Sequence, residues 1–289
     1  MAEQVEARRS RGALAIALAS GTWGTWSLFF RPAEARGGVT PALEAFVVLG
    51  TILVATAPLA LRDRLPGPRP VRAWALLAAQ GGFDAINALL FFAAMQKTSL
   101  AIAVLTHYLA PVLVALGAPV AVGERVGRDT WTALVLALVG LVTLLEPWQG
   151  SSGARLEGAL YGGASAVFFA LSLLAAKRLG RHFAPTEILA WHIPPGLLVI
   201  LPFLPAGVLG TPPAALGLLV LGGLGPGALA GVVFIRGLRH TDASRASILM
   251  LLEPVVAVLV GVVAWHELPR PSAWLGGALV LFAAYRVLR

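Results

Sequence analysis

The chain has 289 residues, of which 58% are hydrophobic and only 12% are charged, and its mean hydropathy is +0.82. Because a soluble domain carries about 25% charged residues, this chain has too few polar side chains to cover a globule of its size. The composition excludes a disordered chain and an ordinary soluble enzyme. The absence of cysteine excludes a disulfide scaffold and a thiolate metal site. The sequence therefore predicts an integral membrane protein.

Turn residues and charges divide the apolar sequence into ten segments of about 17 to 24 residues, the length that crosses a bilayer as a helix. In chain order the predicted spans are 12–30, 42–61, 73–96, 100–122, 131–148, 157–176, 186–205, 213–235, 243–265 and 272–288. The first span follows a charged stretch and lacks a small-residue cleavage site, so it is interpreted as uncleaved. The predicted fold class is an all-α membrane protein with ten transmembrane helices.

Positive charge is distributed unevenly between the two sides of the predicted membrane. Of the 22 Lys and Arg residues, 17 fall on the side of the two termini and five on the opposite side. Because short loops rich in Lys and Arg stay in the cytoplasm, both termini are predicted to be cytoplasmic, in a multi-pass protein of the plasma membrane (the inner membrane of a bacterium). The net charge of +8 then faces anionic lipid, so membrane lipids and not nucleic acid are the predicted partner.

The second half of the chain repeats the first at a constant offset of 143 residues. Four aligned pairs have the same residue type: Phe91 and Phe234, Pro111 and Pro254, Glu124 and Glu267, and Trp131 and Trp274. Between Phe91 and Trp131, 11 of 41 positions are identical. Since five spans is an odd number, the second repeat must enter the membrane inverted relative to the first. The predicted organisation is a cytoplasmic tail (1–11), a first five-helix repeat (12–148), a linker (149–156) and a second, inverted five-helix repeat (157–289).

The repeated motif has a recognisable form. The segment AIAVLTHYLAPVLVALGAPVAVGERVGRDTW and its second copy ASILMLLEPVVAVLVGVVAWHELPRPSAWLGGALVL resemble the signature of the drug/metabolite transporter superfamily, in its EamA branch. The second turn reads His-Glu-Leu where Gly-Glu is typical, and Pro119 is an extra proline. The resemblance covers essentially the whole chain and implies ten helices, cytoplasmic termini and alternating access around a central cavity. Within that branch, the chain is similar to aromatic amino-acid exporters in three features: the Thr-Trp pair of the first span, the acidic residue of the third span and the YLAP sequence of the fourth span.

Polar side chains lie on one face of the third span. Asp84 is mid-span, with Gln80 four residues before it and Asn87 three residues after it, so all three project from the same side of the helix. A charged group at bilayer depth costs about 2.5 kcal/mol or more and should face the bundle interior or a wet cavity. This polar stripe predicts a substrate-binding cavity. The alternative is an interhelical hydrogen-bond network that only holds the bundle together.

The fourth and ninth spans contribute further candidates. Glu253 precedes Pro254, which leaves a backbone carbonyl without its helical donor; binding of a substrate amine or proton is one interpretation and a helix-bend role is the other. His107 has a side chain that titrates near neutral pH, although a satisfied core histidine is the competing interpretation. Tyr108 is predicted to line the cavity, a role that the resemblance also implies.

Deep aromatic side chains complete the predicted binding site. Trp23 lies on one face of the first span with Ser20 and Ser27, and Tyr161 and Phe168 share one face of the sixth span. Such rings can stack on an aromatic or cationic substrate, with lipid contact or core packing as the alternative. The eighth span, which contains LGGLGPGALAGVVF, is rich in glycine and predicts a bending or closely packed helix.

The sequence contains no hydrolase, zinc-enzyme, phosphate-loop or dinucleotide motif, so no catalytic residue, metal or cofactor is predicted. Transport energy must then come from a substrate or ion gradient, with the proton as one candidate. The leading hypothesis is a secondary transporter that exports a small amphipathic metabolite, such as an aromatic or apolar amino acid. The alternatives are a transporter of cationic drugs or quaternary ammonium compounds and, more remotely, an intramembrane lipid-processing enzyme using Asp84 with His107 or Glu253.

Overall fold

The computed structural model describes residues 2–149 and 156–288, and every regular element within those ranges is a helix. Within the described residues, ten helical segments are long and apolar enough to span a membrane, which confirms the predicted number of spans. Five of the spans are continuous helices: α3 (Pro41–Arg62), α4 (Val71–Lys97), α7 (Arg128–Leu145), α8 (Leu156–Leu179) and α15 (Pro271–Leu288). The predicted linker, 149–156, falls almost entirely in residues 150–155, outside the described part.

The other five spans are interrupted within the membrane. The pairs of helices that form them are α1 (Ala2–Trp23) with α2 (Ser27–Glu34), α5 (Leu100–His107) with α6 (Ala110–Ala121), α9 (Pro185–Trp191) with α10 (Ile193–Ile200), α11 (Pro213–Gly222) with α12 (Ala230–Leu238), and α13 (Ala243–Leu249) with α14 (Leu252–Trp265). In the eighth span the two helices are joined by a π-helical segment, η4 (Gly223–Leu229), around Pro226. Three 3₁₀ turns complete the elements: η1 (Pro147–Gln149), η2 (Leu201–Phe203) and η3 (Val208–Gly210).

Most of the predicted N-terminal tail, 1–11, is helical. Helix α1 begins at Ala2, so the helix extends through most of the tail predicted over 1–11. Its first turns, AEQVEAR, consist largely of good helix formers, and this propensity continues the first span beyond its apolar part.

The repeat is visible in the helix boundaries. Helices α5 and α13 start 143 residues apart, as do α7 and α15, and the ends of α7 and α15 are separated by the same offset. The turn between the fourth and fifth spans contains Gly123 at φ 76°, and its counterpart in the second repeat is His266 at φ 55°. A left-handed backbone conformation costs glycine little and is strained in histidine. Although His266 stands where the first turn has glycine, the second turn has the same left-handed backbone conformation as the first.

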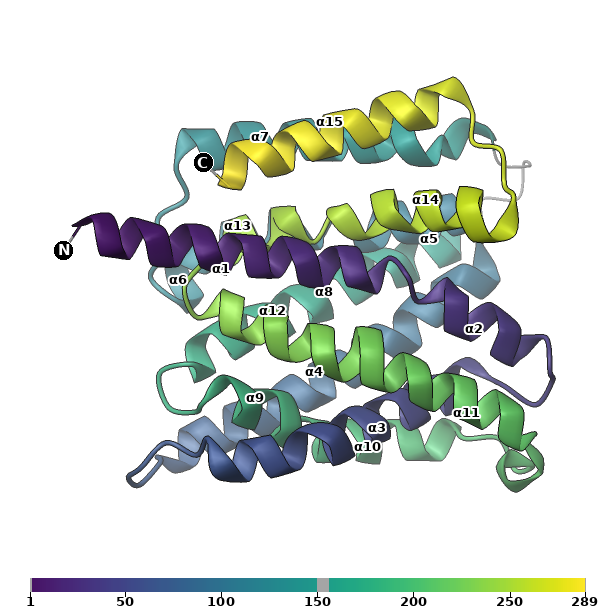
Figure 1. Cartoon of the computed structure of the whole chain (residues 1–289), viewed down its shortest axis with the longest axis horizontal. Coiled ribbons are helices and arrows are strands. Elements are labelled where there is room, and N and C mark those ends of the chain that lie inside the picture. Colours follow the sequence, from purple (N-terminus) through teal and green to yellow (C-terminus); the bar gives the residue numbers. More distant parts are fainter. Residues whose placement is uncertain (1, 150–155, 289) are drawn as a thin grey trace.

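Helix packing relates the two repeats by an approximate two-fold axis. The third span packs on the sixth as the eighth packs on the first, and the fifth and tenth spans pack on each other; α7 and α15 lie side by side at the top of Figure 1. These two helices run antiparallel, because Asp129 in the first turn of α7 lies 3.7 Å from Arg286 in the last turn of α15. Equivalent helices therefore cross the membrane in opposite directions, and the two five-helix repeats are inverted.

Glycines allow the closest helix contacts. A Cβ atom at Gly140 of α7 would lie 2.9 Å from the carbonyl oxygen of Gly276 in α15, and one at Gly237 of α12 would lie 2.6 Å from that of Gly12 in α1. Small residues drive packing in lipid, where apolar burial gives no preference for protein over bilayer.

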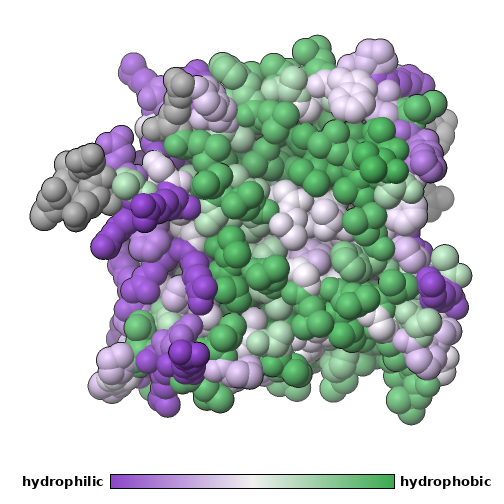
Figure 2. Space-filling model, viewed as in Figure 1, coloured by the Kyte–Doolittle hydropathy of each residue, from purple (hydrophilic) through white to green (hydrophobic). Residues whose placement is uncertain are grey.

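The outer surface matches a membrane environment. Both termini lie at the same end of the bundle in Figure 1, as an even number of spans requires. Figure 2 shows hydrophilic residues gathered at that end, a second set at the opposite end, and a broad apolar band between them. The chain is therefore a multi-pass membrane protein whose helices run along the membrane normal.

Candidate substrate and proton site

The polar stripe of the third span lies on the inner part of α4. Gln80 is buried. The side-chain oxygen atoms of Gln80 and Asn87 are both buried, and neither atom has a hydrogen-bond partner. Asp84 lies between them and remains partly exposed, at 28% of its side chain. Two unsatisfied acceptors beside a carboxylate are costly in a low-dielectric interior unless a ligand supplies donors.

His192 is the partner of Asp84, and the sequence analysis did not single it out. It occupies the break between α9 and α10, and its Nε2 lies 3.2 Å from Asp84 Oδ2. The signal that could have found it is the sequence WHIPPG, because Pro194 and Pro195 cannot donate to the preceding turn and so interrupt the helix at a mid-span histidine.

Close approach of two helices makes the Asp84–His192 contact possible. A Cβ atom at Gly81 would collide with the backbone carbonyl of His192, and one at Gly196 would lie 2.9 Å from the carbonyl oxygen of Gly81. Glycine at both positions therefore lets α4 and α10 approach with backbone against backbone, which brings the carboxylate within reach of the imidazole.

A second group of predicted residues gathers at the breaks of the first, fourth and ninth spans. Tyr108 is buried where α5 ends, and its hydroxyl faces the carboxylate of Glu253 in the first turn of α14. A Cβ atom at Gly24 would lie 2.6 Å from the backbone oxygen of Glu253. The neighbouring Trp23 packs on Phe234, with ring centroids 4.9 Å apart. The phenol of Tyr108 and the carboxylate of Glu253 therefore lie together, and the indole of Trp23 lies against Phe234 at the break of the first span.

His107 lies in the core beside α8. Its Nδ1 is 2.9 Å from Ser165 Oγ, which donates its own proton to the carbonyl oxygen of Gly162, so Nδ1–H of His107 is the donor in this contact. The imidazole ring also packs against Phe91, Tyr108 and Phe169 at centroid distances of 4.6 to 5.3 Å. His107 therefore makes its polar contact with Ser165, whereas Asp84 makes its contact with His192.

The aromatic residues of the sixth span lie next to α4. Phe168 is 6.1 Å from Phe83 between ring centroids, and Phe83 precedes Asp84 by one residue. Tyr161, two turns earlier on α8, is partly exposed. The structure thus places Phe168 beside the third span, while Trp23 and Tyr108 belong to the group around Glu253.

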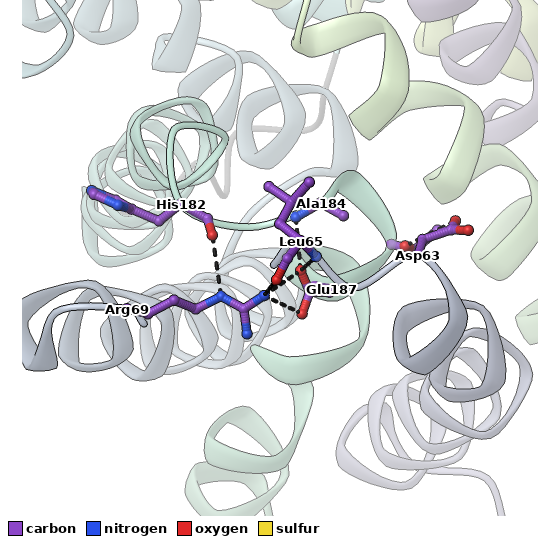
Figure 3. A network of polar contacts seen from close by, with 7 residues as sticks. Asp63, Leu65, Arg69, His182, Ala184 and Glu187 are labelled. Carbon is purple, nitrogen blue, oxygen red and sulfur yellow. Dashed lines mark hydrogen bonds and ion pairs between the residues drawn. The ribbon is translucent and has the colours of Figure 1, made fainter. Parts of the chain in front are cut away.

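Ion pairs hold the helices together at the terminal side of the bundle (Figure 3). Arg69 donates to both carboxylate oxygens of Glu187, at 2.9 and 3.0 Å, and these side chains are only 5% and 1% exposed. The backbone N–H groups of Leu65 and Ala184 donate to the same carboxylate, and Arg69 also donates to the carbonyl oxygens of Leu65 and His182. This Arg69–Glu187 network joins the loop before α4 to the start of the seventh span.

The two sides of the bundle differ in how tightly they are closed. At the terminal side Glu124 accepts from the backbone N–H of Ala243 at 2.6 Å and pairs with Lys177 at 3.3 Å. Burial raises the pKa of Glu124 against the opposing effect of Lys177. Its repeat counterpart Glu267 pairs with Arg31 at 2.6 Å on the other side, where both side chains are about half exposed. The two most deeply buried ion pairs between Arg or Lys and a carboxylate, Arg69–Glu187 and Lys177–Glu124, therefore both lie at the terminal side.

Comparison with known proteins agrees with this architecture. The profile of the EamA-like transporter family matches residues 10–145 and 156–289, which together cover nearly the whole chain. The chain belongs to the EamA-like transporter family. An uncharacterised transporter of Archaeoglobus fulgidus is 34% identical over 272 residues, which is 93% of each chain.

A second relative and a solved structure extend the comparison. A probable terminal-alkyne amino-acid exporter of Streptantibioticus cattleyicolor is 28% identical and covers 93% of this chain and 91% of its own. A solved crystal structure that is 24% identical superposes with a TM-score of 0.78, covering 96% of this chain and 98% of the other, and so shows the same fold. The protein is a multi-pass membrane transporter.

Proposed function

We propose that this EamA-like protein is a secondary transporter that exports small amphipathic metabolites, such as aromatic or apolar amino acids, by alternating access. The inverted repeats support alternating access, because such halves can exchange conformations around a site at the bilayer midplane. The buried contacts on the terminal side and the exposed ones opposite are what a state closed on the terminal side requires. The relative named as an amino-acid exporter supports the substrate class.

The 17-to-5 distribution of basic residues supports a plasma-membrane orientation with both termini in the cytoplasm. In that orientation the Arg69–Glu187 network seals the cytoplasmic side. Asp84 and its neighbours are then reached from the opposite side, and export requires that the network opens once per cycle.

The observation that carries the substrate class is the set of acceptors on α4. Asp84 supplies negative charge, and the free oxygens of Gln80 and Asn87 accept hydrogen bonds. A primary ammonium group has three N–H donors and one positive charge, so it satisfies all three. A quaternary ammonium group has no N–H and would leave both amide oxygens unpaired, at a cost of about 1 to 3 kcal/mol for each.

Transport by purified protein in liposomes tests the proposal. We expect uptake of radiolabelled phenylalanine or tryptophan, little uptake of tetraethylammonium, and a sharp loss of amino-acid transport in Asp84→Asn, which keeps the shape of the side chain and removes its charge. Asp129→Asn is the matched control, because the Asp129 side chain is 94% exposed at a helix end and its variant should transport like the wild type.

The contrary results are equally clear. Transport of tetraethylammonium in preference to amino acids would show that the substrate is a cation without N–H donors. Wild-type amino-acid transport in Asp84→Asn would assign Asp84 a structural role only.

A further inference from the structure

The two hydrogen-bond contacts of His192, with Ile188 and with Asp84, need one more proton than a neutral histidine beside a carboxylate has. His192 Nδ1 lies 2.8 Å from the backbone carbonyl oxygen of Ile188. Because a carbonyl oxygen only accepts hydrogen bonds, Nδ1 must carry a proton. In a neutral imidazole Nε2 would then be a bare acceptor, facing a carboxylate oxygen that is also an acceptor.

A contact of 3.2 Å between Nε2 and Asp84 Oδ2 therefore requires one additional proton. The proton lies either on Nε2, which gives an imidazolium–carboxylate pair, or on Asp84, which gives a carboxylic acid bonded to neutral imidazole. In both forms the pair has no net charge, and His192, with 8% of its side chain exposed, is shielded from water that could replace this bond.

Other charged groups on the surrounding helices lie elsewhere. The elements packed on α4, α9 and α10 include α3, α5, α8 and α12. Within the described residues, the charged and titratable groups of all these elements other than Asp84 and His192 are Glu44, Arg62, Arg72, Lys97, His107, Glu157, Tyr161, Lys177, Arg178, Glu187 and Arg236. Most of them lie in the first or last turns of their helices. Glu187 is neutralised by Arg69, and His107 is bonded to Ser165. Among the described residues, the ion-pair partner of Asp84 is His192.

We propose that the Asp84–His192 pair is the coupling-proton site of the transporter, and that a substrate ammonium group displaces this proton. The inference rests on the proposed function for the identity of the displacing ligand. One carboxylate cannot stabilise two neighbouring cations in a low-dielectric interior. When an ammonium group binds Asp84, the Asp84–His192 pair loses its proton, His192 becomes neutral, and the ammonium group and the Asp84 carboxylate form a pair without net charge. Substrate leaving in one direction is thereby exchanged for a proton entering in the other.

The proton itself can be detected without substrate. The chain has five histidines, so ¹⁵N-histidine spectra are simple, and the His192→Gln variant identifies the signals of His192. At neutral pH we expect a protonated Nδ1 and an Nε2 that carries or shares a proton. Asp84→Asn should shift the Nε2 signal while that of the exposed His182 stays unchanged. A bare Nε2 with the same shift in wild type and Asp84→Asn would overturn the proton site.

Proton release on binding tests the coupling. Phenylalanine is added to weakly buffered protein in detergent, with a pH indicator for released protons and calorimetry for binding in the same sample. We expect about one proton released per bound phenylalanine, fewer protons released per bound phenylalanine in His192→Gln, and wild-type release in the control His182→Gln.

The two proposals fail in different ways. Binding of phenylalanine by the wild type without proton release would overturn the coupling and leave the amino-acid substrate in place. An absence of binding would refute the proposed substrate class and with it the displacement step, while the nitrogen spectra decide on their own whether the pair holds a proton.

Discussion

Glu187→Gln should destabilise this transporter strongly, although the change replaces a single oxygen atom by an amino group. In the wild type Oε2 of Glu187 accepts from Leu65 N–H, Ala184 N–H and Arg69, while Oε1 accepts from Arg69 alone. Glutamine has one carbonyl oxygen. Wherever it points, its NH₂ group faces a donor that needs an acceptor.

The charge of Arg69 makes the loss larger. Its side chain stays 5% exposed and is held over the ring of Phe183, 4.7 Å from the centroid, and beside Trp74, at 5.8 Å, so it cannot turn to water without losing these contacts. Removing one partner of a buried ion pair costs about 3 to 5 kcal/mol. A loss of about 3 kcal/mol corresponds to a change of about 100-fold in the unfolding equilibrium constant.

Equilibrium unfolding in mixed micelles of mild detergent and sodium dodecyl sulfate measures this effect. Glu267→Gln is the control, since it breaks the half-exposed pair with Arg31 and should cost less than about 1 kcal/mol. The double variant Arg69→Met with Glu187→Leu removes both charges and should recover only the part of the loss that comes from the unpaired guanidinium, because the N–H groups of Leu65 and Ala184 still lack their acceptor. Equal losses in Glu187→Gln and Glu267→Gln would refute the reasoning.

Three further outcomes are expected. Gly81→Ala should separate α4 from α10, with an overpacking cost of about 1 to 3 kcal/mol and loss of transport, whereas Gly82→Ala, where a Cβ atom meets nothing within 4 Å, should match the wild type in both measurements. Trp23→Ala and Phe168→Ala should each raise the KM for phenylalanine about five-fold, as loss of a stacking contact of about 1 kcal/mol predicts; unchanged KM in both would exclude them from the substrate site. The raised pKa of Glu124 means that the folded state holds this proton more tightly than the unfolded state. The stability that the proton contributes is therefore present below the usual carboxyl range and is lost as pH rises through the raised pKa. Glu124→Gln should flatten this decline in unfolding experiments at several pH values, and an unchanged slope would contradict the assignment to Glu124.

The predicted substrate site was reached from the sequence only in part. Asp84, Gln80 and Asn87 were predicted from the sequence because a polar stripe in an apolar helix is a local pattern with helical spacing. His192 was missed because its contact depends on a partner more than 100 residues away, although the sequence WHIPPG marks a helix break at this histidine. For the same reason the sequence left His107 open between ligand and core residue, and the contact with Ser165 is visible only once α5 packs on α8.

Membership of the EamA-like transporter family, ten spans and an inverted repeat were determined by the sequence alone, since the repeated motif, apolar length, turn residues and the 143-residue offset are properties of the chain that need no packing. Tertiary structure alone decided where the spans break, which charges are paired, and which acid meets which histidine. In lipid, helices gain little from hiding apolar surface, so their contacts depend on where small residues such as Gly81 and Gly196 let backbones approach. That complementarity arises between helices, and it brings Asp84 to His192 and Arg69 to Glu187.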